Sequence, residues 1–314
     1  MATPSSSSSL PHVAVLLATW NGLRWLPEQV ESILNQAGVD VRLIALDDES
    51  TDGTQAWLAE LAANDQRVTV LPSMGASGGA APNFYRLLEH ADLAPDELVA
   101  FADQDDIWRQ GKLARHAALI RDEGYDAISS SITSFTEDGA RHLVRKDFPQ
   151  RQFDFLFESP GPGSTFLMTP RLAAFAKEVV QHDDGGARQV DYHDWLVYVI
   201  ARARGWKWRI DGEPTVDYRQ HDANVIGSNK GGRAALKRLQ LIRSHWHRNQ
   251  AVLLAEIATT VADPGLRPAI ERVRELLTTR GLRSRYELAR LAPQLRRRPR
   301  DRKIIGVLIA SGVW

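Results

Sequence analysis

Three carboxylates stand within four residues at Asp103, Asp105 and Asp106, with Gln104 between them. In a partly buried site such charges repel one another by roughly several kcal/mol unless a cation lies among them. Carboxylate oxygens suit Mg²⁺ or Mn²⁺, and an ion held there can bridge the two phosphates of a nucleotide diphosphate. We therefore expect Asp105 to bind a divalent metal and Asp103 to bind the metal or a ribose. The alternative is that the cluster caps a helix.

A second acidic cluster begins at Asp47 and Asp48 and continues to Asp52. A carboxylate can accept a hydrogen bond from a pyrimidine ring N–H, which is the role we expect for Asp48. Asp52 is better explained as the cap of the helix that follows. An Asp pair after a strand also fits a phospho-acceptor receiver domain, although that fold needs a further Asp at a later strand end and a distant Lys.

Elements of alternating type position these clusters. Apolar runs at 12–18, 41–46, 67–71 and 97–102 indicate buried strands, and helical spacing indicates helices at 25–36, 54–63 and 83–90. Short strands that alternate with helices predict a parallel α/β sheet. Three of the four strands end in polar residues, and ligands bind beyond the carboxyl ends of such strands. We therefore expect the acidic clusters to meet at one edge of the sheet.

The second half of the chain has a looser pattern. We expect helices at 112–121, 170–181 and 192–204, a strand at 126–130, and two short strands at 207–210 and 215–218. Residues 131–157 predict no clear element. From 232 to about 291 the pattern is helical, with a break at 263–265.

Five motifs in this order and spacing resemble family 2 glycosyltransferases with the GT-A fold, and most closely their bacterial rhamnosyltransferase branch. The resemblance covers about residues 12–230. The motifs are Thr19-Trp20-Asn21-Gly22, the run from Asp47 to Thr54, the run from Asp103 to Trp108, His193-Asp194-Trp195, and Tyr218-Arg219-Gln220-His221.

The resemblance implies an inverting transfer of a sugar from a nucleotide diphosphate donor, with a divalent metal, Mg²⁺ or Mn²⁺, and no covalent intermediate. By position, Asp105 and His221 would bind the metal and Asp194 would be the catalytic base. The residues that would bind the nucleotide sugar are Thr19, Asn21, Asp48, Asp103, Gln104 and Arg219.

Asp194 also has a physical case. An acceptor hydroxyl must lose its proton as it attacks the anomeric carbon, and a carboxylate at the mouth of a helix can take that proton. We expect Trp108 and Trp195 to offer ring faces on which a sugar stacks. Helix capping is the alternative for Asp194, and simple packing is the alternative for His221. The turn from Gly161 to Ser164 can shape an acceptor pocket or be a plain turn.

The charge of the chain is unevenly distributed. Residues 230–314 hold 19 Lys and Arg against 6 Asp and Glu, whereas residues 1–229 hold 20 against 33. The basic run 296–303 precedes eleven mostly apolar residues, too few for the about 20 that span a bilayer. We expect this tail to lie on an anionic membrane surface and expect no nucleic-acid partner. A helix docked on the body is the alternative.

These observations give a disordered leader at 1–10, a GT-A catalytic domain at 11–230 and a basic helical region at 231–314. The chain has no cysteine and its Ser-rich start lacks the features of a secretion signal, so we expect it in the cytoplasm, peripheral to the inner face of the membrane. The leading hypothesis is transfer of L-rhamnose from dTDP-rhamnose to a saccharide or lipid-linked saccharide of a cell-surface polysaccharide. A nucleotidyltransferase, which would need a basic Gly-rich phosphate loop, and a non-catalytic sugar-binding module are the alternatives.

Overall fold

Parallel strands form the first half of the central sheet. β1 (His12–Thr19) lies between β2 (Asp40–Asp47) and β4 (Leu98–Ala102), and β2 pairs with β3 (Val68–Val70). Successive β1 side chains point to opposite faces, so each face has its own apolar core. The structure, a computed structural model, describes residues 10–221 and 245–314. The expected leader and the domain boundary at 230 therefore lie essentially outside the described residues.

The second half of the sheet is mixed. β8 (Leu167–Met168) is antiparallel to both β4 and β6 (Ala127–Thr136), and β6 forms a hairpin with β7 (Arg141–Val144). β9 (Trp208–Gln220) runs parallel to β6, and β5 (Ile107–Trp108) is antiparallel to β9. The strand order is β3-β2-β1-β4-β8-β6-β9-β5, with β7 on β6.

Two sequence-based expectations for this half were wrong or incomplete. The expected strands at 207–210 and 215–218 are one strand, β9, because a register shift between Ser130 and Ile132 of β6 takes up the Gly212-Glu213-Pro214 turn signal and pairing then resumes. The stretch at 131–157, which predicted no element, contains the end of β6 and the whole of β7.

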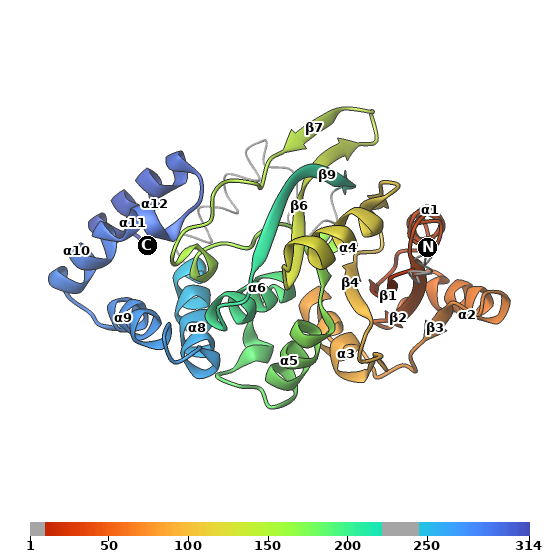
Figure 1. Cartoon of the computed structure of the whole chain (residues 1–314), viewed down its shortest axis with the longest axis horizontal. Helices are drawn as coiled ribbons and strands as arrows, with labels where there is room; N and C mark the ends of the chain where they lie inside the picture. Colours follow the sequence, from red (N-terminus) through yellow and green to blue (C-terminus); the bar gives the residue numbers. More distant parts are fainter. Residues whose placement is uncertain (1–9, 222–244) are drawn as a thin grey trace, which may run out of the picture.

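Helices cover both faces of the sheet (Figure 1). One core contains buried residues of α1 (Leu26–Leu34), α2 (Thr54–Asn64) and α4 (Lys112–Glu123). The other contains residues of α3 (Ala80–His90), α5 (Pro170–Gln181) and α6 (His193–Ala203). Single 3₁₀ turns at Asp154–Leu156, Gly163–Thr165 and Ala187–Gln189 lie between these elements.

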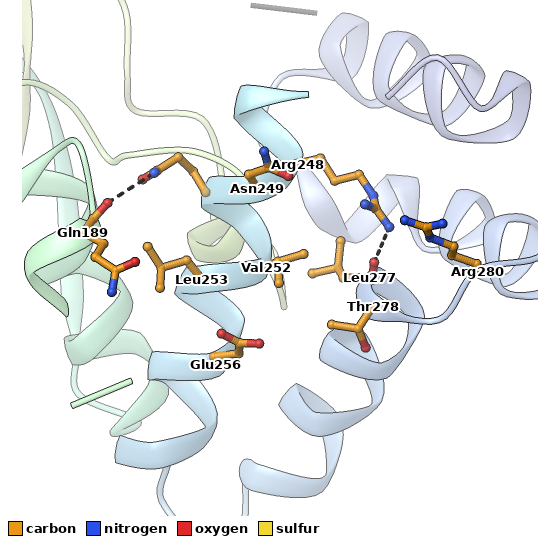
Figure 2. Close-up of a pocket in the computed structure, with 10 residues that line it drawn as sticks. Gln189, Arg248, Asn249, Val252, Leu253, Glu256, Leu277, Thr278 and Arg280 are labelled. Atoms are coloured by element: carbon orange, nitrogen blue, oxygen red, sulfur yellow. Dashed lines mark hydrogen bonds between the residues drawn. The ribbon is translucent and has the colours of Figure 1, made fainter. Parts of the chain in front are cut away.

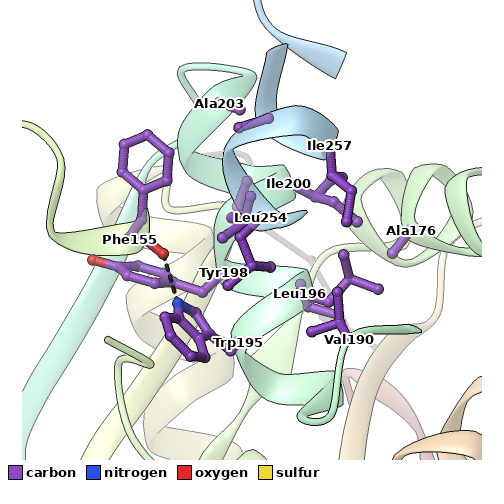
Figure 3. Packing of buried hydrophobic residues seen from close by; sticks show 14 of the residues in the cluster. Phe155, Ala176, Val190, Trp195, Leu196, Tyr198, Ile200, Ala203, Leu254 and Ile257 are labelled. Atoms are coloured by element: carbon purple, nitrogen blue, oxygen red, sulfur yellow. Dashed lines mark hydrogen bonds between the residues drawn. The ribbon is translucent and has the colours of Figure 1, made fainter. Parts of the chain in front are cut away.

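The C-terminal helices extend the second of these cores. α8 (Trp246–Val261) packs on α6, and Leu254 and Ile257 of α8 lie against the apolar face of α6 (Figure 3). The C-terminal end of the chain is docked on the body, since Ile305 and Ile309 are buried. No helix in the described parts of the chain is long and apolar enough to cross a membrane. The helices are α8 (Trp246–Val261), α9 (Arg267–Thr278), α10 (Leu282–Arg290), α11 (Ala292–Leu295) and α12 (Pro299–Ser311).

Candidate active site

The acidic cluster follows β4 at the carboxyl edge of the sheet. Asp106 is buried and accepts hydrogen bonds from Ser164 Oγ at 2.7 Å and from the Arg219 backbone N–H at 3.2 Å. Asp103 and Asp105 are half-buried. Asp106 therefore joins the cluster to the loop before β8 and to the end of β9, whereas Asp103 and Asp105 are the carboxylates that remain open to a ligand.

His221 reaches this cluster from the C-terminal end of β9. Its Nε2 lies 2.7 Å from Asp105 Oδ2, and its ring stacks on Trp25 with centroids 4.2 Å apart. Arg219 donates from Nε to the Asp105 carbonyl at 2.9 Å and from Nη2 to Glu28 at 2.6 Å. The structure thus brings Asp105 together with Arg219 and His221, which lie more than 100 residues later in the chain.

Crowding of the carboxylates has an electrostatic consequence. Burial, then the charge of Asp105, then that of Asp194 raise the pKa of Asp103 above its usual range. Burial, then the charges of Asp105 and Asp103, raise the pKa of Asp106. A cation would relieve this repulsion. Across residues 10–221 and 245–314, no three His, Asp or Glu side chains gather closely enough to form a complete metal-binding group.

Asp194 lies in the first turn of α6 and is half-buried. One carboxylate oxygen accepts from the Trp195 backbone N–H at 2.6 Å, so the side chain does contact the helix start. The other lies 3.1 Å from Ser159 Oγ. Burial raises the pKa of Asp194 to about 6, while the Ser159 bond and the nearby Lys146 charge act in the opposite direction. A carboxylate of this pKa near Asp103 is suited to accept a proton close to neutral pH.

Comparison with known proteins adds to this geometry. Residues 14–183 match the sequence profile of Glycosyl transferase family 2. The chain is 36% identical over 248 residues to the dTDP-rhamnosyl transferase RfbG of Shigella flexneri, covering 79% of this chain and 85% of the relative. It belongs to glycosyltransferase family 2. Transfer in this family inverts the anomeric centre.

More distant relatives agree with this placement. The chain is 24% identical over 223 residues to WfaP of Escherichia coli, named a UDP-Glc:alpha-D-GlcNAc-diphosphoundecaprenol beta-1,3-glucosyltransferase, covering 69% of this chain and 80% of WfaP. S. aureus TarS 1–349, solved with UDP-GlcNAc, superposes with a TM-score of 0.60 at 16% identity, over 96% of this chain and 88% of TarS. The mannosyltransferase PcManGT of Pyrobaculum calidifontis, solved with GDP-Man and Mn²⁺, gives 0.50 at 18% identity, over 97% and 87%. The family match favours glycosyl transfer over the two alternative functions.

In this family 2 glycosyltransferase, the residues expected to hold the nucleotide surround the ends of β1 and β2. Thr19 is buried and donates to Asp47 Oδ1 at 2.8 Å, so it orders the loop after β2 and does not face a ligand, contrary to our expectation. Asn21 has a left-handed φ of 48° and accepts from the Thr51 backbone N–H at 2.8 Å. Asp48 accepts from both the backbone N–H and the hydroxyl of Ser77. Binding of a nucleotide by Asn21 and Asp48 stays a prediction.

Gln104 makes two hydrogen bonds to the backbone of the loop after β1. Its Oε1 accepts from the Trp20 backbone N–H at 2.8 Å, and its Nε2 donates to the Trp20 carbonyl at 2.9 Å. Gly22 lies close beside it: a Cβ there would lie 2.2 Å from Oε1, so the Gln104 side chain would have to shift. The amide therefore holds the loop after β1 against the acidic cluster, and its contact with the donor sugar stays a prediction.

The expectation that Trp108 and Trp195 stack on a sugar is wrong. Trp108 is only 2% exposed, and Lys112 Nζ lies 3.5 Å from the centre of its ring. Trp195 is 3% exposed, and its Nε1 donates to the Phe155 carbonyl at 2.7 Å inside the core (Figure 3). Neither ring offers a face to a ligand.

Sequence reasoning did not identify several residues that the structure brings to the site. Trp25 stacks on His221, Ser77 holds Asp48, and Ser159 and Lys146 lie beside Asp194. Only the loop that contains Ser77 had a signal, the glycines at 75–79. The others lack a sequence signal, because they reach the site through tertiary packing.

A surface hollow elsewhere on the enzyme is separate from this site. It has a volume of about 480 Å³, and its lining comes mainly from α8 and α9 (Figure 2). The Arg248 guanidinium at its wall donates to the Leu277 carbonyl at 2.6 Å and so holds the end of α9. None of the predicted site residues lines this hollow, so we assign it no part in sugar transfer.

Proposed function

We propose that the chain transfers L-rhamnose from dTDP-rhamnose to a saccharide acceptor with inversion at the anomeric carbon, with Asp194 as the base. The observation that carries this proposal is the half-buried Asp194 carboxyl, which has a pKa of about 6 and lies close enough to Asp103 for its charge to raise the pKa of that residue. The similarity to the dTDP-rhamnosyl transferase RfbG supports the choice of donor.

The reaction needs one proton acceptor and one departing diphosphate. The acceptor hydroxyl loses its proton to a carboxylate oxygen of Asp194 while its oxygen forms the bond to the anomeric carbon. The bond from that carbon to the diphosphate oxygen breaks on the opposite face, and its electron pair leaves with the diphosphate. The residues near the acidic edge hold donor and acceptor in line for this displacement.

A divalent ion fits the acidic edge in part. Asp105 and His221 approach within 2.7 Å, and Asp103 is crowded by a second carboxylate. We propose that Asp105 and His221 hold Mg²⁺ or Mn²⁺, with donor phosphate oxygens to complete its ligands and with Asp103 directed to the ion or to the donor ribose. Such an ion supplies neutralisation of the charge that develops on the diphosphate.

A donor panel tests the proposed function. The purified enzyme would be assayed with dTDP-rhamnose, UDP-Glc, UDP-GlcNAc and GDP-Man, each with Mn²⁺, Mg²⁺ or EDTA, and the anomeric configuration of the product would be determined by NMR. We expect turnover with dTDP-rhamnose, loss of turnover in EDTA, and an inverted product. Preference for another donor would contradict the choice of rhamnose, and transfer that is insensitive to EDTA would contradict the metal.

We also propose that the acceptor is lipid-linked and that the enzyme works at an anionic membrane surface. The expected basic run is only partly available, since Arg296, Arg297 and Arg302 make hydrogen bonds within the protein. The surface that remains is on α10 and α12, which we call the α10–α12 face. It consists of the exposed residues Leu282, Tyr286, Arg298, Arg300, Lys303, Ile304 and Val307.

The composition of the α10–α12 face suits an anionic lipid surface. Its exposed apolar side chains, such as Leu282 and Val307, can enter the headgroup region, and its basic side chains attract anionic lipid at about 1 kcal/mol each near the surface. α10 and α12 pack on each other, so the two helices form one rigid unit. The undecaprenol-linked acceptor in the name of WfaP supports a membrane-bound acceptor.

A further inference from the structure

The C-terminal helical region makes hydrogen bonds to the segment that contacts Asp194, the candidate base. This segment, residues 153–159, contains one 3₁₀ turn and ends at Ser159. The Phe153 backbone N–H donates to the Gln294 carbonyl at 3.1 Å. The Phe157 carbonyl lies 2.8 Å from Arg296 Nη1 and 3.0 Å from His247 Nε2. Backbone groups of segment 153–159 are therefore fixed by residues more than 85 positions later in the chain.

Arg297 makes the most contacts with segment 153–159. It is 3% exposed, and its guanidinium donates to Asp154 Oδ2 at 3.0 Å and to the Ser159 carbonyl at 2.5 Å. Its backbone N–H donates to Glu158 Oε1 at 2.5 Å. A buried guanidinium is stable only when its charge and donors are satisfied, so the partners and the arginine fix one another.

Asp154 connects this arrangement to the helix that carries the base. The side chain is fully buried and also accepts from Arg202 Nη1 at 3.0 Å and from the Tyr198 hydroxyl at 3.1 Å. Tyr198 and Arg202 belong to α6, which has Asp194 in its first turn. Asp154 thus holds the middle of α6 and the C-terminal region at once, while Ser159 meets the start of α6.

Ser159 can hydrogen-bond to Asp194 in both protonation states of that carboxyl group. Its Oγ lies 3.1 Å from Asp194 Oδ2 and 2.8 Å from the Gly161 carbonyl. The hydroxyl has one proton, so it donates to the Asp194 carboxylate before transfer. When Asp194 has taken the acceptor proton, the carboxyl can donate to Ser159 Oγ, whose own proton turns to the Gly161 carbonyl. No atom other than hydrogen needs to move.

We propose that Arg297 is a positioning residue for sugar transfer: through the Ser159 carbonyl and Asp154 it holds the Ser159 hydroxyl on Asp194. The C-terminal helical region would then be part of the catalytic apparatus and more than an appendage. This inference rests on the proposed role of Asp194 as the base.

Two variants of Arg297 and one of Ser159 separate positioning from general stability. Arg297→Met keeps the aliphatic part of the side chain and removes the guanidinium group, whereas Arg297→Lys keeps the positive charge. Ser159→Ala removes the hydroxyl alone. Arg280→Met is the matched control, because Arg280 is an exposed arginine of the same region for which the described residues provide no hydrogen-bond partner. Circular dichroism and thermal melting would establish that each variant is folded at the assay temperature.

The measurement is kcat and KM for donor and acceptor, with kcat followed from pH 5 to 8.5 in the presence of Mn²⁺. We expect Arg297→Met and Ser159→Ala each to lower kcat at least about tenfold with donor KM within about twofold of wild type. The hydrogen bond from Ser159 favours the ionised form of Asp194. Without it, the fall of kcat on the acid side of the pH profile should move to higher pH. Lys146, Tyr85, Tyr192, Asp191 and Asp103 also surround Asp194, and burial, then the charge of Arg297, lower the pKa of Lys146. The shift of the pH profile is therefore interpreted from Ser159→Ala, which leaves every charge in place.

The double variant Ser159→Ala/Arg297→Met tests whether Arg297 affects kcat through Ser159 or independently of it. If Arg297 acts through Ser159, the double variant should lose little more kcat than Ser159→Ala alone. We expect Arg297→Lys to recover part of the loss and Arg280→Met to match wild type. Fully additive losses, or a wild-type kcat and pH profile in folded Arg297→Met, would overturn the inference. If Asp194→Asn kept full transfer, the proposed base itself would be wrong, which is a different result.

Discussion

At the scale of single residues, the proposed base must lose its proton before it can accept another. Asp194 has this property near neutral pH, because burial disfavours its ionised form and raises its pKa to about 6, whereas Ser159 and Lys146 limit the rise. A fully exposed Asp would be too weak a base, and a fully buried unpaired one would stay protonated.

The pH dependence of the enzyme follows from this balance. Below a pH of about 6 Asp194 is protonated in the free enzyme and cannot act as a base, so kcat/KM should fall about tenfold per pH unit on the acid side. Rates with saturating Mn²⁺ from pH 4.5 to 8 would measure this limb, and donor binding over the same range serves as the control. A kcat/KM that is constant down to pH 4.5 would contradict the assignment.

Residue types and spacing were enough to find the acidic edge but not to assign every side chain. The family resemblance assigned Asp105 and His221 to one site, and in the structure His221 Nε2 lies 2.7 Å from Asp105 Oδ2. The prediction that Trp108 and Trp195 stack on a sugar was wrong. Proximity in sequence to an acidic motif does not indicate whether a ring points to the site or into the core. Gln104 also holds a loop backbone with both ends of its amide, a contact that the sequence did not indicate.

At the scale of elements, the loop before β8 packs directly on the start of α6. A Cβ on Gly163 would lie 2.4 Å from His193 Nε2. The His193 ring is itself stacked on Phe84 with centroids 3.7 Å apart and is buried, so it has little freedom to move. The close approach of Gly163 therefore fixes the residue that immediately precedes Asp194.

Gly163→Ala should disturb this contact. We expect a loss of about 1–3 kcal/mol in the free energy of unfolding, as is usual for overpacking, together with a lower kcat because the start of α6 must shift. Urea unfolding and steady-state kinetics would measure the two effects. Gly265→Ala is the control, since its added Cβ would meet only the Asp263 side chain, at 3.3 Å. Equal stability of Gly163→Ala and wild type would show that the contact is unimportant.

The elements of the first hundred residues were predictable because each strand is a mostly apolar run and each helix has apolar residues at helical spacing. β1, β2, β3 and β4 lie within a residue or two of their expected ranges. The second half was harder, since the β6–β7 hairpin has alternating and polar residues and β9 contains Gly212 and Pro214. Pairing with β6 keeps β9 extended across that interruption, and this tertiary effect is absent from local sequence.

At the scale of the whole molecule, the α10–α12 face lies at the C-terminal end of the protein, distant from β1–β3 in Figure 1. The sequence showed that this region is basic and helical, yet not which arginines point inward. Arg297 is buried by Asp154 and Glu158, whose positions depend on a segment about 140 residues earlier. A charge count therefore overstates the surface available to lipid.

A single substitution that introduces a negative charge on the α10–α12 face tests whether this face binds a membrane. Val307 is 68% exposed on α12, and Val307→Glu should weaken binding to vesicles that contain phosphatidylglycerol by about tenfold, because it adds a charge that anionic lipid repels and removes an apolar contact. Leu143→Glu, at a 58% exposed residue of β7, introduces the same charge elsewhere and should leave binding unchanged. Co-sedimentation at low and high salt would measure both. Equal binding of the two variants would contradict the assignment of this face.

The most direct test of the central claim is the rate of rhamnose transfer by Asp194→Asn. The amide keeps the size of the side chain but cannot take the acceptor proton, so kcat should fall about 10²- to 10⁴-fold while the affinity for dTDP-rhamnose, measured by calorimetry, stays within a few-fold of wild type. A folded Asp194→Asn enzyme that transfers rhamnose at the wild-type rate would contradict the account.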